Sequence, residues 1–413
     1  MGRKRILFFR PDFFIKPSTL QPPWPHHPFI PNFPHLCKKN PIPLHLTQLK
    51  LTNFKNYEWQ EIACSPHINC FLGLNGMGKT NLLDAVYYAC MTRSHTGVTD
   101  VHIARHEADF FRIEAHFQTD GKSEKVVAKV IPRKSKVFEY NELAYSKLSD
   151  HIGAFPVVMM APGDTEMVTD GSEVRRRFLD NTLSQIDQGY LSALLLYNKV
   201  LQQRNAALKQ FAEQRQFNAA LLEVYNAQLI APGTLIADKR RAFADTFREV
   251  LQQVYATISG GHEVVDSQYE SKLNDRPLAA LLAEATEKDR MLQRTTVGIH
   301  RDDLALTLDG RSVKQFASQG QLKSLALALK LTQYETLRRE KNMRPLLLLD
   351  DIFDKLDKNR VQQLLELLLQ QSFGQIFITD TDEQRVREIL SKLDTPFHIY
   401  HVEEGVATLA HTA

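Results

Sequence analysis

Apolar and polar side chains alternate over residues 46–54, which is the pattern of a strand with one buried face. Residues 68–72 form a short, largely apolar run that suits a buried strand. Four leucines at residues 346–349 suit a strand buried on both faces, and a further strand is expected over residues 375–379. These segments predict an α/β architecture.

Helical spacing of apolar residues marks the other elements. Residues 81–90 have this spacing, and residues 322–337 are rich in Leu and Ala and contain no Gly or Pro. Residues 190–229 are predominantly helical, but their apolar positions do not repeat as heptads over many turns. We therefore expect a mostly helical second lobe and no long coiled coil.

A glycine-rich segment joins the buried strand at 68–72 to the helix at 81–90. Residues 73–80 read Gly-Leu-Asn-Gly-Met-Gly-Lys-Thr and fit G-x-x-x-x-G-K-[ST] at every defined position. The backbone N–H groups of such a loop wrap phosphates, and the dipole of the following helix favours the negative charge. Lys79 is expected to reach the β- and γ-phosphates and Thr80 to ligate Mg²⁺. The predicted nucleotide-binding residues of this segment are Gly73, Leu74, Asn75, Gly76, Met77, Gly78, Lys79, Thr80 and Asn81.

Two carboxylates, Asp350 and Asp351, follow the four-leucine strand. We expect Asp350 to hold Mg²⁺, directly or through water, and Asp351 to act as general base toward the attacking water. The alternative is a core strand that ends in a solvated pair of aspartates. Lys79, Asp350 and Asp351 are the predicted catalytic residues, Thr80 and Asp350 are the predicted metal ligands, and ATP and Mg²⁺ are the expected cofactors.

The helix over residues 322–337 is preceded by Ser318-Gln319-Gly320-Gln321. Ser318 is placed to cap the helix. Such a tetrapeptide is a weak signal by itself, because Ser and Gly favour helix starts in general. Its position shortly before the acidic strand makes it a candidate part of the nucleotide site.

The order of these motifs resembles the head of ABC-type ATPases, and residues 353–357 (Phe-Asp-Lys-Leu-Asp) resemble its D-loop. In that class the signature of one subunit closes over the nucleotide bound to the other, so that two heads enclose two ATP molecules. The resemblance implies that Ser318 and Gly320 contact the γ-phosphate of the ATP held by a partner in a homodimer.

Further segments resemble the RecF family of bacterial recombination-repair proteins. They are residues 51–57 (Leu-Thr-Asn-Phe-Lys-Asn-Tyr), 93–95, 175–180, 298–304 and 318–331, and with the acidic strand they span nearly the whole body of the chain. The resemblance implies a cytoplasmic, ATP-dependent clamp on double-stranded and gapped or single-stranded DNA. Such a protein dimerises on ATP, is released by weak, DNA-stimulated hydrolysis, and helps to load recombinase with RecO- and RecR-type partners in repair and replication-fork recovery.

Several residues depart from the family or class pattern. Lys55 stands in place of Arg, which keeps the charge but loses the planar fork, and Ile299 stands in place of Pro. Asp351 stands where most ABC ATPases have Glu. RecF proteins generally share this Asp. Residues 379–382 (Thr-Asp-Thr-Asp) lack the His of the switch position. We therefore expect slow hydrolysis, suited to a timed clamp and not to a motor.

Contacts to DNA phosphates are expected from local groups of cations. Residues 175–177 are arginines that either contact DNA or pair with nearby acids, and residues 301–303 are expected to form a structural ion-pair network. Lys199, Arg204 and Lys209 are expected at the surface of the helical lobe. Residues 121–136 have the pattern of a hairpin, for which a solvated strand face is the alternative to DNA contact. The cations of this hairpin are Lys122, Lys125, Lys129, Arg133, Lys134 and Lys136.

Charge and cysteine content narrow the function classes. The net charge is +3, but residues 1–43 carry +6 and the rest of the chain is near −3, so DNA binding must depend on local patches.

The four cysteines show neither C-x-x-C nor zinc-ligand spacing. Reduced thiols are expected, with an oxidised Cys64–Cys70 pair as the alternative. The longest apolar runs, such as Leu346–Leu349, are far shorter than the ~20 residues of a membrane span.

Residues 1–43 contain ten of the 18 prolines, a density that helices and central strands do not tolerate. The segment is either a disordered basic tail or an artefact of the assumed start of translation. The artefact is favoured, because a well-formed strand begins directly after the segment.

The remaining chain is divided into a first part of the ATPase head (44–160), a helical lobe (161–294) and the signature helix with the rest of the head (295–413). Two other functions stay open. One is a transporter-type ABC ATPase subunit, although residues 161–165 lack the Gln found at the junction between its lobes. The other is a nucleotide-gated scaffold without meaningful turnover.

Overall fold

The computed structural model describes residues 41–352, 373–391 and 395–412. The Pro-rich segment, apart from residues 41–43, lies outside the described residues, and so do the D-loop-like residues 353–357. None of the helices in the described part of the chain combines the length and apolar character needed to cross a membrane.

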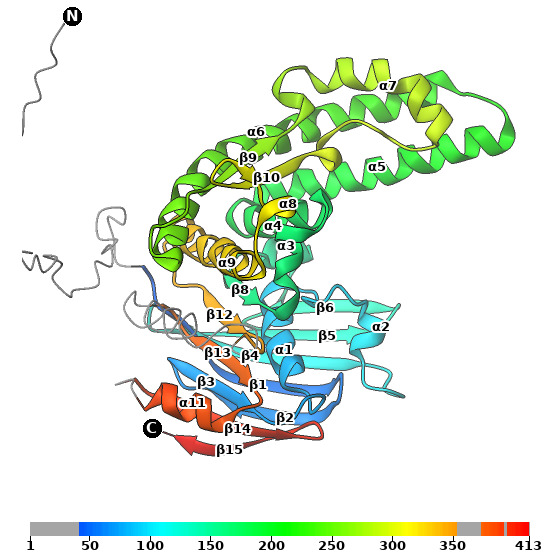
Figure 1. Ribbon diagram of the computed structural model, residues 1–413. Coiled ribbons are helices and arrows are strands. Elements are labelled where there is room, and N and C mark those ends of the chain that lie inside the picture. The colour runs from blue at the N-terminus through cyan, green and yellow to red at the C-terminus, as the bar shows by residue number, and fades with distance from the viewer. Residues whose placement is uncertain (1–40, 353–372, 392–394, 413) are drawn as a thin grey trace, which may run out of the picture. The chain divides into compact units, whose positions relative to one another are not determined.

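A mostly parallel six-stranded sheet lies below the helical region in Figure 1, with the strand order β15-β14-β3-β13-β12-β8. All residues of β3 and β12 are buried, because both faces of the sheet are covered, and this explains their unbroken apolar sequences. The strands predicted over residues 68–72, 346–349 and 375–379 are confirmed, the last one displaced by one residue. The strands are β3 (Ile68–Leu72), β8 (Val157–Met160), β12 (Leu346–Leu349), β13 (Ile376–Asp380), β14 (Phe397–Glu403) and β15 (Val406–Thr412).

A second sheet is antiparallel and has the order β2-β1-β4-β5-β6-β7. The strand predicted over residues 46–54 and the hairpin predicted over residues 121–136 are both part of it. Its strands are β1 (Leu44–Phe54), β2 (Tyr57–Ala63), β4 (Phe111–Thr119), β5 (Lys122–Ile131), β6 (Ser135–Tyr140) and β7 (Leu143–Ala144).

Two hydrophobic cores lie on opposite faces of the parallel sheet. Leu346 and Leu348 of β12 belong to the core that includes α1 (Lys79–Met91) and the antiparallel sheet. Leu347 and Leu349 belong to the core that includes α9 (Gln319–Lys341). The helix α1 is buried along nearly its whole length because it packs between the two sheets.

The helical region contains α4 (Ser172–Ile186), α5 (Gln188–Gln214), α6 (Ala219–Ser259) and α7 (Leu278–Leu292). Figure 1 shows α5 and α6 side by side as a hairpin, with α7 along them. A small sheet joins this region to α9 and has the order β11-β10-β9. The predicted α/β fold with a mostly helical second part is confirmed, and the described residues form no long coiled coil. The small sheet comprises β9 (Val265–Glu270), β10 (Asp303–Leu308) and β11 (Arg311–Ser312).

Short helical segments complete the fold. They are α2 (Asp100–Ile103), α3 (Glu166–Thr169), α8 (Val313–Phe316), α11 (Glu383–Leu390) and the 3-10 turns η1 (Leu148–His151), η2 (Pro162–Thr165), η3 (Lys272–Asn274) and η4 (Ile299–Arg301).

The surface position expected for Arg204 is wrong. Its side chain is fully buried, and its Nη1 lies 2.7 Å from Asp289 Oδ2 and 2.8 Å from Thr295 Oγ1. Its Nε donates to Asn226 Oδ1 at 2.9 Å. The packing of α7 against α5 and α6 buries this arginine, and the buried charge is compensated by Asp289. Lys199 and Lys209 are exposed, as expected.

Cys64, Cys70 and Cys90 are free thiols. The structure therefore has the expected reduced state and not the Cys64–Cys70 pair. Cys37 lies outside the described residues.

Candidate nucleotide-binding site

The glycine-rich loop runs from the end of β3 to the start of α1, and two of its glycines permit close approach of neighbouring groups. A Cβ atom on Gly73 would lie 2.3 Å from the carbonyl oxygen of Val402 in β14. Gly78 has a φ of 113°, and a Cβ atom there would lie 2.3 Å from Asn56 Nδ2. Any larger residue would push the loop away from β14 or from the β1–β2 turn.

The turn between β1 and β2 holds the loop from outside. Asn56 Nδ2 donates to the carbonyl of Met77 at 3.0 Å, and Asn81 Nδ2 donates to Asn56 Oδ1 at 2.8 Å. The buried Tyr57 hydroxyl donates to the carbonyl of Gly78 at 3.0 Å. In the sequence, residues 51–57 were identified only by their resemblance to a segment of the RecF family. The role of Asn56 and Tyr57 in holding the loop was not predicted.

The loop and the acidic strand meet at Asp350. Thr80 Oγ1 donates to Asp350 Oδ1 at 2.8 Å, across 270 residues of sequence. Lys79 is buried, and its Nζ donates to the carbonyls of Gly73 and Leu74 at 2.9 and 3.1 Å. The structure therefore brings together the lysine, the hydroxyl and the carboxylate that the sequence singled out.

Thr379, at the end of β13, is a site residue that sequence reasoning missed. Its hydroxyl donates to Asp350 Oδ1 at 2.8 Å and accepts the backbone N–H of Asp351 at 2.9 Å. Burial raises the pKa of Asp350, while hydrogen bonds from Thr80 and Thr379 act in the opposite direction. The available signal was the position of Thr379 at the carboxyl end of the strand next to β12.

The residues around Asp350 fit a Mg²⁺ ion. The hydroxyls of Thr80 and Thr379 and the carboxylate of Asp350 are hard oxygen ligands. The described part of the chain holds no cluster of three or more His, Cys, Asp or Glu side chains suited to a metal. Mg²⁺ is usually bound by one or two carboxylates together with substrate phosphates and water, and Asp350 would supply such a carboxylate.

Lys55 is the counter-ion of a buried carboxylate in α1. Its Nζ lies 2.7 Å from Asp84 Oδ2, and Asp84 also accepts bonds from Ser94 Oγ and the backbone N–H of His95, each at 2.7 Å. Burial lowers the pKa of His95 to about 4. Two segments that resemble the RecF family, residues 51–57 and 93–95, are thus joined through Asp84.

The signature tetrapeptide forms the first turn of α9. Ser318 caps the helix as predicted: its Oγ accepts the N–H of Gln321 at 3.3 Å, and its own N–H donates to Gln321 Oε1 at 2.7 Å. Ser318 and Gln319 are exposed. Within the described residues, residues 318–321 make no hydrogen bond or ion pair with the loop at 73–80.

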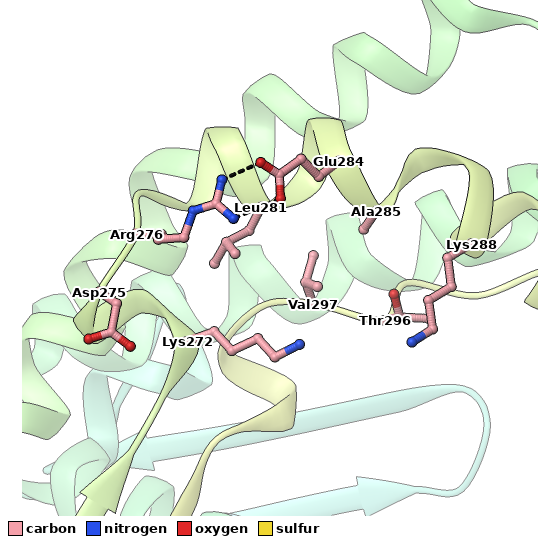
Figure 2. Close-up of a pocket in the computed structure, with 9 residues that line it drawn as sticks. All are labelled: Lys272, Asp275, Arg276, Leu281, Glu284, Ala285, Lys288, Thr296 and Val297. Atoms are coloured by element: carbon pink, nitrogen blue, oxygen red, sulfur yellow. Dashed lines mark hydrogen bonds and ion pairs between the residues drawn. The ribbon is translucent and has the colours of Figure 1, made fainter.

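Among the recesses of the described residues, two are lined by several charged side chains. One of about 750 Å³ borders the β1–β2 turn and is lined by Lys55, Asn56, Arg105, His106 and Arg133, among others. The other, of about 390 Å³, lies in the helical region; Figure 2 shows Lys272 and Lys288 pointing into it from opposite sides. Arg276 at its rim is paired with Glu284.

The cations proposed for DNA divide into paired and exposed groups. Arg175 pairs with Asp303 at 2.7 Å, and Arg177 pairs with Glu173. The ion-pair network expected around residues 301–303 is present, since Asp302 and Asp303 contact Arg240 and Arg175. In the β5–β6 hairpin, three lysines have acidic partners and the other cations are exposed. The pairs are Lys125–Glu114, Lys129–Glu139 and Lys136–Asp100, and the exposed cations are Lys122, Arg133 and Lys134.

Known proteins are similar to this chain in sequence over most of its length. The DNA replication and repair protein RecF of Flavobacterium johnsoniae is 40% identical over 359 residues, which cover 87% of this chain and 100% of that protein. The protein of the same name from Phocaeicola vulgatus is 42% identical over 365 residues, or 88% of this chain and 98% of that protein.

Similarity to solved structures supports the same family. The recombination mediator protein RecF-ATP of the RecFOR pathway has a TM-score of 0.80 at 28% identity, covering 89% of this chain and 98% of that one. An Smc head domain from Pyrococcus furiosus, at 15% identity and a TM-score of 0.52 over 89% of this chain and 96% of that one, shares the fold alone. Residues 45–408 match the model of the RecF/RecN/SMC N terminal domain. The chain therefore belongs to the RecF family of DNA replication and repair proteins.

Proposed function

We propose that this chain is an ATP-dependent DNA clamp that acts in recombinational repair and replication. The observation that carries the proposal is the contact between Thr80 and Asp350, which joins the phosphate-binding loop to the acidic strand. The similar proteins are DNA replication and repair proteins, and one similar solved structure is that of RecF-ATP.

In this proposal Lys79 exchanges the carbonyls of its own loop for the β- and γ-phosphates of ATP. Thr80 and Asp350 would hold Mg²⁺, and the ion would neutralise phosphate charge. Asp351 accepts a proton from the attacking water, and Thr379 fixes the positions of both aspartates through its hydroxyl. The side chain of Asp351 is shorter than the Glu of most ABC ATPases and places water less well, so hydrolysis is slow.

The nucleoside end of ATP extends into the recess beside the β1–β2 turn. Asn56 supports this assignment, because it lines the recess and also holds the loop that binds the phosphates. A single side chain would thereby respond to both ends of the nucleotide.

The second half of each ATP site comes from a partner copy. The exposed position of Ser318 and Gln319, away from the loop of their own chain, supports closure in trans by residues 318–321 in an ATP-dependent homodimer. We assign residues 44–160 and 295–413 to the ATPase head and residues 161–294 to the helical lobe. RecO- and RecR-type proteins are the proposed partners, in the cytoplasm.

DNA phosphates bind the exposed cations of the β5–β6 hairpin, Lys122, Arg133 and Lys134. Arg133 and Lys134 also line the recess assigned to the nucleoside, so the proposed DNA surface borders the nucleotide. The arginines at 175–177 are a weaker choice, because Arg175 and Arg177 already have acidic partners. Backbone contacts of this kind carry affinity without reading sequence.

Binding of a labelled gapped duplex, with ATP and with ADP, tests the proposal in the wild type and Lys79→Met. We expect tight, salt-sensitive binding with ATP that is lost in Lys79→Met and kept in Lys147→Met, which removes an exposed lysine outside the loop. Equal binding in all conditions would show that DNA affinity is independent of the nucleotide. Phosphate release measured in the same samples separates the clamp from a scaffold without turnover.

A further inference from the structure

Both ends of the Gln321 side-chain amide are engaged. Its Oε1 accepts the backbone N–H of Ser318 at 2.7 Å, and its Nε2 donates to Glu263 Oε1 at 2.7 Å. A glutamine amide has distinct donor and acceptor ends. A carboxylate at Glu263, which can only accept, therefore fixes the orientation in which the oxygen of Gln321 faces Ser318.

Glu263 is itself held by the end of the long helix α6. Its Oε2 accepts the hydroxyl hydrogen of Tyr255 at 2.6 Å. Tyr255 lies in the last two turns of α6 and is fully buried. Glu263 lies between the end of α6 at Ser259 and the start of β9 at Val265, and its side chain is half-buried. Hydrogen bonds thus connect α6 to Ser318 through Glu263 and Gln321.

We infer that Glu263 is a positioning residue that couples the α5–α6 hairpin to the signature residues of the ATP site. This inference rests on the proposed function, in which Ser318 acts on a nucleotide in the partner copy. A rigid-body shift of α6 moves Tyr255 and Glu263, and the capping box at Ser318 and Gln321 must follow or break. A displacement of the α5–α6 hairpin would therefore change how well two heads close on ATP.

Three variants test this coupling. Glu263→Ala removes both hydrogen bonds, and Glu263→Gln keeps an amide oxygen that can accept from Gln321. Glu270→Ala is the matched control, since Glu270 is an exposed acid at the end of the neighbouring strand β9. For each protein we would measure hydrogen exchange of residues 318–321, ATP binding by the monomer, ATP-dependent dimerisation and the midpoint of thermal unfolding.

Glu263→Ala should speed amide exchange at residues 318–321 about tenfold, because the amides of Ser318 and Gln321 lose the fixed capping box. It should weaken ATP-dependent dimerisation by about the same factor, the effect of one lost charge-assisted hydrogen bond. ATP binding by the monomer should match that of Glu270→Ala, whereas the unfolding midpoint should fall below that of Glu270→Ala, because the buried Tyr255 hydroxyl loses this acceptor. Glu263→Gln should restore most of the losses in exchange protection, dimerisation and stability.

The inference is overturned if Glu263→Ala exchanges and dimerises like Glu270→Ala. It is also overturned if ATP binding by the monomer falls together with dimerisation, because the loss of Glu263 would then disturb the whole head and not only residues 318–321. If the wild type does not dimerise with ATP, the proposed function fails, and the exchange rates at residues 318–321 still decide whether Glu263 positions them.

Discussion

Thr379 holds two acidic residues with one hydroxyl group. It donates to the side chain of Asp350 and accepts the backbone N–H of Asp351. A buried carboxylate is costly unless its oxygen atoms are hydrogen-bonded, and Thr379 is fully buried beside Asp350. Its hydroxyl therefore stabilises the ionised state of Asp350. It also fixes the backbone of Asp351 directly after the strand.

Thr379→Val keeps the shape of the side chain and removes the hydroxyl. We expect the rate of ATP hydrolysis to fall about tenfold or more, because both aspartates lose a fixed hydrogen bond. ATP affinity should change less than the rate, since Lys79 and the loop at 73–80 are untouched. Single-turnover hydrolysis and equilibrium binding measure the two effects.

Two further variants complete the Thr379 experiment. Thr379→Ser should retain most of the activity, because it keeps the hydroxyl. Thr408→Val, at an exposed threonine of β15, is the control. An unchanged hydrolysis rate in Thr379→Val would remove Thr379 from the site.

At the scale of elements, the β1–β2 turn and the phosphate loop act as one unit. Asn56 and Tyr57 bond to the carbonyls of Met77 and Gly78, and Gly78 has no Cβ where Asn56 approaches. A phosphate loop must present several N–H groups in one direction. The turn supplies part of that preorganisation from a different sheet.

Asn56→Ala tests this unit, because Asn56 is exposed and its loss should leave the fold intact. We expect ATP affinity to fall about tenfold, since the bonds to Met77 and Asn81 are both removed. Glu213→Ala, an exposed substitution in α5, should have ATP affinity close to that of the wild type. Calorimetric titration with ATP measures the difference, and equal affinities in the two variants would contradict the support role.

At the scale of the whole described fold, buried histidines link stability to pH. Burial lowers the pKa of His95, His151 and His300 to about 4 in each case, against an ordinary value of 6.5. Between these values the unfolded chain binds more protons than the folded one. The neutral histidines therefore make their full contribution to the free energy of unfolding above about pH 6.5. This contribution is lost as the pH falls toward about 4.

His151→Gln tests this linkage, because Gln can still donate to the carbonyl of Ala89 but does not titrate. Between about pH 7.5 and about pH 5.5 the wild type should lose about 1 kcal/mol more unfolding free energy than His151→Gln. Urea unfolding at the two pH values gives this difference, whatever the substitution costs at neutral pH. His106→Gln, at an exposed position, should show the same pH dependence of the unfolding free energy as the wild type. If His151→Gln also shows the wild-type pH dependence, the explanation is wrong.

Local sequence determined the elements whose pattern is complete within a few residues. The alternation in β1, the four leucines of β12 and the glycine-rich loop each specify their conformation through nearest neighbours and burial. The same holds for the capping box at Ser318. These features sufficed to predict the α/β head, the absence of a long coiled coil and the candidate pairing of Thr80 with Asp350.

Tertiary structure alone decided contacts between segments far apart in the chain. The burial of Arg204 depends on the packing of α7 against the α5–α6 hairpin. The sequence of the long helix that contains Arg204 does not predict this packing. Thr379, Asn56 and Glu263 are ordinary polar residues at element ends, and each acquires its role from a partner that the fold brings near. The physical reason is that a hydrogen bond requires two groups within about 3 Å, and sequence periodicity specifies which face of an element is buried but not what lies against it.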